Sequence, residues 1–170
     1  MVISSKNYFL ESNIMKQLTV IPLVLLAGLA SAAEPVKLKV ETYSGYFVSN
    51  KFEPKATTSF LTAHTQKEFD QVFGAAFVMR DKSHRLAADA FKSQLVLAAI
   101  RRGMAICTYQ VTSVTEKDGV VQLRYKTTTK KSDSASFACP LIVSIPQGKY
   151  RAIEFHENDK LVKRLLIKGK

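Results

Sequence analysis

The feature that most constrains this fold is an Asp-Gly pair, Asp118-Gly119, which separates two long segments rich in strand-forming residues. Asp and Gly both tolerate positive φ, which the two-residue turns of β-hairpins require. The flanking segments, 105–116 and 120–130, are therefore predicted to be paired antiparallel strands. In a simple pairing about this turn, residues near 106 face residues near 131, so the register of a long hairpin is predicted as well.

Short strand patterns recur along the rest of the chain. Leu95–Ile100 is a continuous apolar run of strand length, which is typical of a central strand buried on both faces. Residues 37–42 alternate between charged or polar and mostly apolar positions. Closely spaced strands of this kind predict a mainly β fold, either an antiparallel β-sandwich or a partly open barrel of about seven strands, with one short helix. The remaining predicted strands are 43–47, 57–63, 136–145 with a break at Pro140, 150–156 and 161–167.

The one predicted helix begins at a capping box. Thr65 and Glu68 have the spacing at which a hydroxyl and a carboxylate accept hydrogen bonds from the first N–H groups of a helix. Gly74 is the predicted stop. The apolar face between these two signals consists of Phe69, Val72 and Phe73. Residues 79–90 are predicted to be a loop with a short helical turn.

The N-terminal part of the chain is typical of a secretory signal peptide. Met15-Lys16-Gln17 is a short positive stretch, and an apolar run follows over 18–29. Ala30-Ser31-Ala32 then has the small-x-small pattern that a signal peptidase recognises. The apolar run is shorter than the roughly 20 residues that span a bilayer. We therefore expect cleavage after residue 32 and export to the periplasm or the extracellular space.

These signals divide the chain into three expected parts. Residues 1–14 are a mis-assigned upstream extension, 15–32 are the signal peptide, and 33–170 are a single domain without a transmembrane segment. The whole chain has a formal net charge of +11, and the part after residue 32 keeps 23 basic and 13 acidic residues, a net charge of +10. A basic exported protein suits an anionic envelope surface, an acidic glycan or an acidic protein rather than nucleic acid. The alternative is that the charge only keeps the protein soluble.

Two basic pairs are candidate binding residues. Arg101 and Arg102 follow the buried apolar run, and Lys130 and Lys131 lie at the end of the predicted hairpin that is far from Asp118. The hairpin register brings both pairs to one end of the sheet, where they could bind an anionic partner. The alternative is a solvated sheet edge that Lys and Arg protect from pairing with other strands.

The two cysteines, Cys107 and Cys139, are predicted to form a disulfide. An even cysteine count in an exported chain favours a bridge, because the compartment is oxidising. The alternative is two buried thiols on different strands, since the sequence does not show whether their Cα atoms lie within bridging distance.

No catalytic motif is recognisable in the chain. The three histidines, His64, His84 and His156, lie far apart in the sequence and lack metal-ligand spacing. A nucleophile pair of Cys107 with His64 or His156 is conceivable, because such partners need only be close in space. We expect no enzyme activity, no metal and no cofactor.

The order of these segments resembles the PrcB-like domain family, which is named after a subunit of a bacterial surface protease complex. The resemblance extends from Tyr43 to Leu166. It departs from the family at 104–107, where Met-Ala-Ile-Cys stands in place of the Thr-Gly-Gly-Tyr loop that the family usually carries. The matching segments are Tyr43-Ser44-Gly45-Tyr46, 65–73, Ala88-Asp89-Ala90-Phe91, 95–100, Val111-Thr112-Ser113-Val114, 140–146 and 153–166.

The resemblance implies a secreted, non-enzymatic β-sandwich module that is associated with a protease or envelope complex. Together with the missing catalytic motifs, it makes an exported binding or accessory module the expected function. A protease inhibitor that presents an exposed loop such as Arg101 to Met104 is one alternative. An unrecognised Cys/His enzyme is another.

Overall fold

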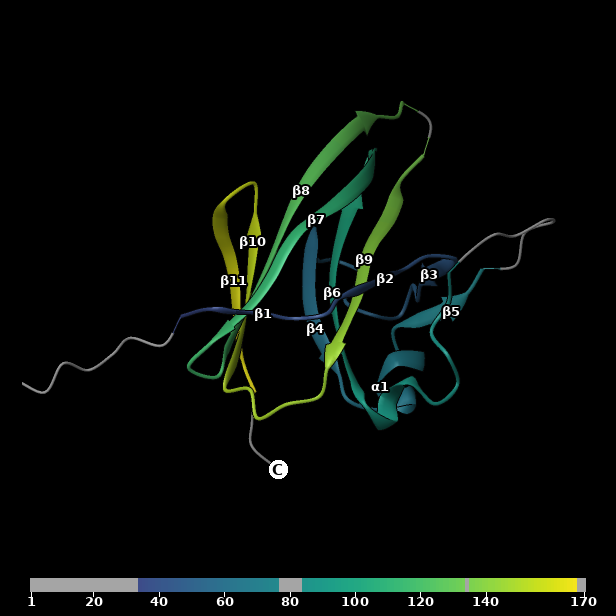
Figure 1. Ribbon diagram of the computed structural model, residues 1–170. Helices are drawn as coiled ribbons and strands as arrows, with labels where there is room; N and C mark the ends of the chain where they lie inside the picture. Colours follow the sequence, from purple (N-terminus) through teal and green to yellow (C-terminus); the bar gives the residue numbers. More distant parts are fainter. Residues whose placement is uncertain (1–33, 77–83, 134, 168–170) are drawn as a thin grey trace, which may run out of the picture. The chain divides into compact units, whose positions relative to one another are not determined.

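The computed structural model describes residues 34–76, 84–133 and 135–167, which belong to one compact unit. The fold is mainly β, as predicted, with two larger sheets that face each other as a sandwich (Figure 1). Within the described residues, no helix has the length and apolar character needed to cross a membrane. The first sheet has five strands, in the spatial order β1 (Val36–Lys37), β7 (Ala105–Lys117), β8 (Val120–Lys131), β10 (Ala152–Glu157) and β11 (Lys160–Leu166).

The second sheet has four strands, and a small third sheet lies beside it. The described part of the chain also contains one α-helix, α1 (Gln66–Asp70), and a 3-10 turn, η1 (Ala90–Lys92). The four-stranded sheet has the order β2 (Glu41–Tyr43), β9 (Phe137–Pro146), β6 (Gln94–Gly103) and β4 (Thr58–Ala63), and the two-stranded sheet pairs β3 (Tyr46–Val48) with β5 (Phe73–Ala75).

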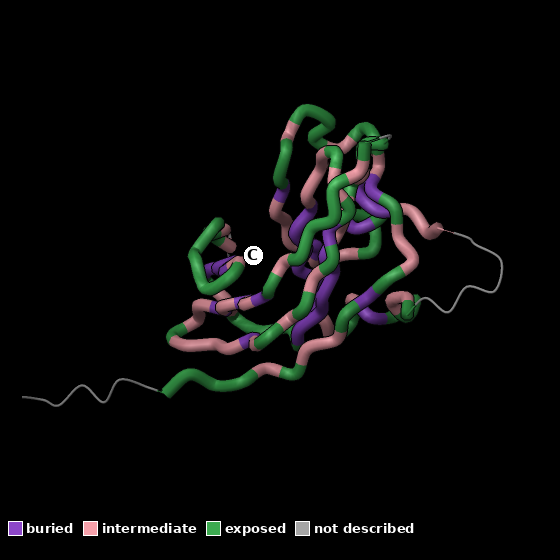
Figure 2. The backbone as a smooth tube through the Cα atoms, turned by 90° about the horizontal axis from the view of Figure 1, so that it is seen from above, coloured by how far each residue is buried: buried purple, intermediate pink, exposed green. Residues whose placement is uncertain are grey.

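The main core lies between the five-stranded and the four-stranded sheets. Phe155 of β10 is fully buried, and its ring centroid lies 5.0 Å from that of Phe60 of β4. Leu38 and Val40 pack against this core from the segment before β2, on the face that the alternation of 37–42 predicts. The buried residues lie along the inner parts of the strands, as Figure 2 shows in purple. Removing this apolar surface from water supplies the main driving force for the fold.

A second core covers the other face of β6. Val96, Ala98 and Ile100 of β6 are fully buried there, and they share this core with Phe69 of α1. Leu95, Leu97 and Ala99, which alternate with them, belong to the main core. Strand β6 is therefore buried on both faces, which confirms the prediction from its continuous apolar sequence.

The long hairpin forms with the predicted turn and register. Asp118 has φ of 51° and Gly119 has φ of 73°, so both turn residues use the left-handed region that this sequence favours. Ile106 faces Lys130, and Ala105 faces Lys131. A bulge between Val111 and Ser113 shifts the pairing by one residue, which places the far ends of the strands in this register.

The helix is shorter than the sequence predicts. Thr65 caps it, and its hydroxyl accepts a hydrogen bond from Glu68 N at 3.2 Å. The Glu68 carboxylate accepts one from His64 N at 2.6 Å rather than from the N–H of the cap residue itself. Phe73 and Gly74 lie in β5 and not in the helix, because the chain pairs with β3 there, opposite Val48 and Phe47. Residues 79–83 of the predicted loop lie outside the described residues.

Two further details differ from the sequence predictions. Strand β9 continues through Pro140 rather than breaking there, because β2 pairs only with Ile142–Ser144. Pro140 therefore lies where one side of β9 needs no N–H donor for a ladder. Strand β10 pairs with β8 in parallel, so the larger sheet is not purely antiparallel.

Candidate functional site

The two basic pairs predicted from the sequence lie at one end of the sandwich. Arg101 and Arg102 are in β6, where they face Cys139 and Ala138 of β9. Lys130 and Lys131 end β8 and face Ile106 and Ala105 of β7. A single residue, Met104, separates β6 from β7, so the chain passes directly from one sheet to the other at this end. Figure 1 shows the start of β7 and the end of β8 near the upper end of β9, where β9 begins.

The loop expected from Arg101 to Met104 is not formed. Strand β6 continues through Gly103, whose φ of 151° lies outside the conformations that residues with a side chain readily adopt. The apolar run ends at Ile100, but the backbone pairing with β9 continues for three more residues. The two arginines are therefore held in a strand.

Arg101 is neutralised within the molecule. Its guanidinium donates to Glu157 Oε1 at 2.6 Å, and this bond connects β6 of one sheet with β10 of the other. The Glu157 side chain is only 13% exposed, against 36% for the Arg101 side chain. This arrangement stabilises both charges by pairing and leaves Arg101 poorly placed to attract a partner.

Arg102 is half-buried and organises the loop between β3 and β4. One terminal nitrogen of its guanidinium donates to Ser59 Oγ at 2.8 Å and, more weakly, to the Ala56 carbonyl at 3.4 Å. The other donates to the Phe52 carbonyl at 2.9 Å. All three acceptors are neutral, so these contacts bind the arginine without compensating its charge.

Lys130 and Lys131 are exposed, and two exposed apolar residues lie beside them. Met104 is 49% exposed and Ile106 is 43% exposed. Lys131 Nζ lies 3.6 Å from an oxygen of Asp133, but both of these side chains are almost fully in water, where such a pair contributes little. We call Met104, Ile106, Lys130 and Lys131 the basic tip. The sequence predicted its lysines but not its apolar pair, although Ile106 lies at an outward position of the β7 alternation.

Cys107 and Cys139 are neighbours but are free thiols, so the predicted disulfide is not present in the structure. Cys139 Sγ accepts a hydrogen bond from the backbone N–H of Cys107 at 3.2 Å, and therefore lies over the backbone of β7. Both sulfurs also lie 3.9 Å from the Ala105 carbonyl oxygen. Each sulfur thus contacts backbone groups, and the two side chains also interact with each other without a covalent bond. The pKa of the Cys107 thiol is raised, mainly by burial and to a smaller extent by the neighbouring Cys139.

A half-buried phenol, that of Tyr109, adjoins the cysteines. The Tyr109 hydroxyl donates to the Cys139 carbonyl at 3.0 Å, and its ring packs edge-on against Tyr125 at a centroid distance of 5.8 Å. Burial raises the pKa of both phenols far above the usual value. The nearby Arg101 guanidinium acts to lower the pKa of the Cys107 thiol, but burial outweighs it. The surroundings of Cys107 therefore favour the neutral thiol over the reactive thiolate.

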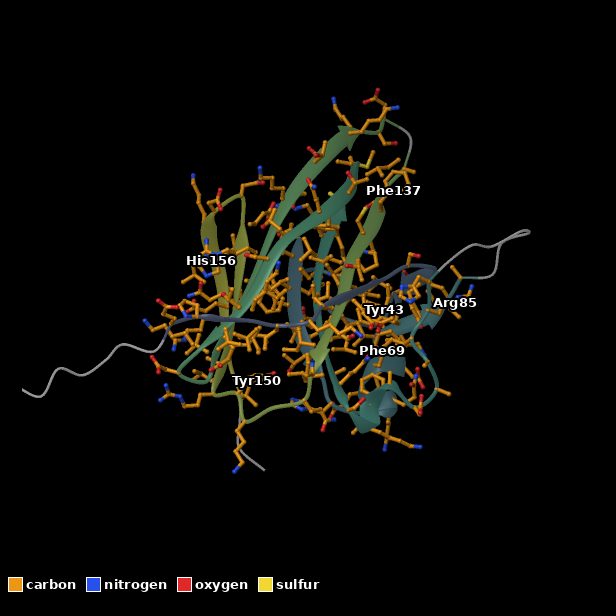
Figure 3. All side chains as sticks on the ribbon, viewed as in Figure 1. Tyr43, Phe69, Arg85, Phe137, Tyr150 and His156 are labelled. Carbon is orange, nitrogen blue, oxygen red and sulfur yellow. The ribbon has the colours of Figure 1, made fainter. Side chains whose placement is uncertain are left out.

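The histidines lie in separate places. His156 contacts Glu154 through Nε2 at 3.2 Å, and Figure 3 shows it on the side of the sandwich formed by β10 and β11. The ring of His84 packs on Tyr43 at a centroid distance of 5.0 Å, and its Nδ1 lies 3.0 Å from the Thr42 carbonyl. His64 contributes its backbone N–H to the helix cap. Within the described ranges, no histidine is hydrogen-bonded to a cysteine, and no three His, Cys, Asp or Glu side chains form a group suited to a metal ion.

A cleft that the sequence did not indicate lies next to the basic tip. It has a volume of about 370 Å³ and lies between the loop after β3 and the start of β9, with Arg102 in its wall. Phe137, which faces Gly103 across the sheet, contributes an apolar part of the same wall. No local sequence motif predicts this cleft, because the residues that line it come from segments that are far apart in the chain.

Comparisons with protein-family models, with curated proteins and with solved structures found no match to this chain.

Proposed function

We propose that this protein is an exported, non-catalytic binding module that contacts an acidic partner through the basic tip. The observation that carries the proposal is the position of Met104 and Ile106, exposed apolar side chains beside the exposed Lys130 and Lys131. Leaving neighbouring apolar side chains exposed to water is unfavourable in free energy. Exposed apolar residues with charged residues around them are typical of a surface that contacts a partner.

The charges of the tip set the chemistry of the partner. Exposed lysines speed the encounter with an acidic surface, but each exposed ionic contact contributes only about 0.2–1 kcal/mol. The apolar pair supplies the part of the contact that salt does not screen. We therefore expect weak, salt-sensitive binding to an acidic protein or anionic surface of the cell envelope. A protease-associated complex of the PrcB-like kind is the setting that the order of sequence segments supports.

Replacing the two lysines tests this proposal without disturbing the fold. Arg101 and Arg102 have partners inside the molecule, so the informative variant is Lys130→Gln/Lys131→Gln alone. Its matched control is Lys67→Gln/Lys149→Gln, which removes two exposed lysines at the opposite end of the strands. The probe is fluorescent poly-glutamate, and binding is measured by anisotropy at low and at high salt.

The tip variant should bind the probe several-fold more weakly at low salt, and the control variant should lose much less. With a glutamate–leucine copolymer as the probe, which adds apolar side chains to the same charge, a Met104→Ser/Ile106→Ser variant should weaken the binding that remains at high salt. Equal losses in the lysine variant and its control would mean that net charge alone attracts the probe, and would refute the basic tip as the site.

A further inference from the structure

The cleft beside the basic tip combines one cation with an apolar wall. Its lining includes Phe52, Pro54 and Phe137, with Ser136 at its polar side and Arg102 as its charged residue. Figure 3 shows Phe137 on β9 at the end where β8 stops. The volume of about 370 Å³ lies at the lower end of the range for ligand sites, and so suits a single amino-acid residue better than a large cofactor.

The charge of Arg102 has no anionic partner in the described part of the chain. Its three hydrogen bonds reach two carbonyl oxygens and one hydroxyl. The adjacent Arg101, by contrast, is paired with Glu157. A guanidinium has more N–H donors than the three that these bonds use, and it binds a carboxylate through two parallel hydrogen bonds. A half-buried cation that is held in place but not neutralised is a pre-organised site for a carboxylate.

We propose that the Arg102 cleft binds a carboxylate attached to an apolar group, as at the C-terminus of a partner polypeptide that ends in an apolar residue. The apolar wall of Phe52, Pro54 and Phe137 would take the last side chain, and Arg102 would take the terminal carboxylate. The basic tip begins next to the cleft, because Gly103 faces Phe137 and precedes Met104. The residues before the C-terminus could therefore extend over Met104 and Ile106. In this respect the inference rests on the proposed function and names the chemistry that the partner must present.

Short peptides without charged side chains test the cleft separately from the tip. One fluorescent peptide, Gly-Ser-Gly-Ser-Phe-Leu, carries a free C-terminal carboxylate, and a second differs only in a C-terminal amide. The free acid should bind the protein, and the amide should bind at least about tenfold more weakly, since a charge-assisted hydrogen bond is lost. Equal binding of acid and amide would refute the inference.

Variants of the cleft avoid the loss of structure that removal of Arg102 risks. Ser136→Asp adds a carboxylate at an exposed position in the lining, where it can occupy Arg102 in place of the ligand. Ala135→Asp adds the same charge at the neighbouring exposed position, which is not part of the lining. Ser136→Asp should abolish binding of the free acid, whereas Ala135→Asp should weaken it only slightly. Equal effects of the two variants would contradict a site in the cleft.

Two further measurements distinguish a peptide carboxylate from a free fatty acid as the ligand, and distinguish the cleft from the basic tip as the binding site. Hexanoate, which has an apolar chain and a carboxylate but no peptide, should displace the peptide only at much higher concentration. Displacement at equal concentration would contradict the polypeptide source. Lys130→Gln/Lys131→Gln should leave binding of the free-acid peptide unchanged. Failure of the basic tip with poly-glutamate can therefore be distinguished from failure of the cleft with this peptide. A large loss in this variant would show that the peptide binds to the tip and not to the cleft.

Discussion

The guanidinium of Arg101 and the carboxylate of Glu157 meet at 2.6 Å and join the two sheets of the sandwich. Arg101→Gln should lower the free energy of unfolding by about 1–2 kcal/mol, between the values for exposed and for buried pairs. The loss arises because the Glu157 carboxylate, which is only 13% exposed, is left without its ion-pair partner. Urea unfolding followed by circular dichroism measures it.

A double-mutant cycle isolates the pair itself. Arg101→Gln/Glu157→Gln should lose less stability than the sum of the single variants, with a coupling energy of about 1 kcal/mol. Lys131→Gln is the control, because its ion pair with Asp133 is exposed on both sides and its loss should stay within about 0.5 kcal/mol. Strict additivity of the two single variants would show that the pair contributes nothing to joining the sheets.

The turn of the long hairpin depends on Gly119. Gly119→Ala should lower the free energy of unfolding by about 1–2 kcal/mol, because φ of 73° is unfavourable for a residue with a Cβ. The new Cβ would also lie 3.1 Å from Nε of Arg151, whose side chain donates to the Asp118 carbonyl. Asp118→Asn is the control, since Asn tolerates the same region. A Gly119→Ala protein as stable as the control would contradict the left-handed turn.

Stability should fall at alkaline pH because of Cys107, Tyr109 and Tyr125. Their folded-state pKa values are raised by burial above the ordinary values of 9.0 for the thiol and 10.0 for the phenols. Their stabilising contribution is therefore complete below these ordinary values and is lost as the pH rises above them, where the unfolded chain ionises first. Unfolding in urea, measured from neutral to strongly alkaline pH, should show the decline.

Removing one phenol should make this decline shallower. Tyr109→Phe loses the hydrogen bond to the Cys139 carbonyl, at a cost of about 1 kcal/mol near neutral pH, but it also removes one group that ionises on unfolding. Tyr46→Phe is the control, because its hydroxyl accepts the N–H of Leu86 away from this cluster. A pH dependence that is as steep in Tyr109→Phe as in the control would exclude Tyr109 as a contributor.

The proposed export with cleavage of the signal peptide predicts a particular N-terminus for the protein in its native host. Removal of the signal peptide after Ala32 should leave Ala33 as the first residue. Mass spectrometry of the intact protein from the envelope and from the medium measures this directly. An N-terminus before Leu18 in that material would contradict export through this signal.

Local sequence signals predicted correctly those strands whose position is set by a single short-range feature, such as a turn or a continuous apolar run. The Asp118-Gly119 turn and the continuous apolar run Leu95–Ile100 gave the hairpin, its register and the strand buried on both faces. The helix end was wrong because Phe73 fits either a helical face or a strand, and pairing with Val48 decides between them. Sequence spacing carries no information on such long-range pairing.

The candidate site was predicted only in outline, for the same reason. The register correctly brought Arg101 and Arg102 to the end where Lys130 and Lys131 lie. It did not reveal that Arg101 has a partner in Glu157, a residue 56 positions later in the chain, or that Arg102 lines a cleft. Whether a charge is free or already paired depends on tertiary contacts, so it could not be predicted from a cluster of basic residues.

The most direct test of the basic tip is to map the contact by amide chemical shifts. In a titration of the isotope-labelled protein with poly-glutamate at low salt, the largest shifts should fall on residues 104–106 and 130–131. Gln147–Lys149, at the opposite end of the strands, should stay unchanged. Shifts that spread evenly over exposed lysines, or that centre on the opposite end, would contradict a binding module that acts through this tip.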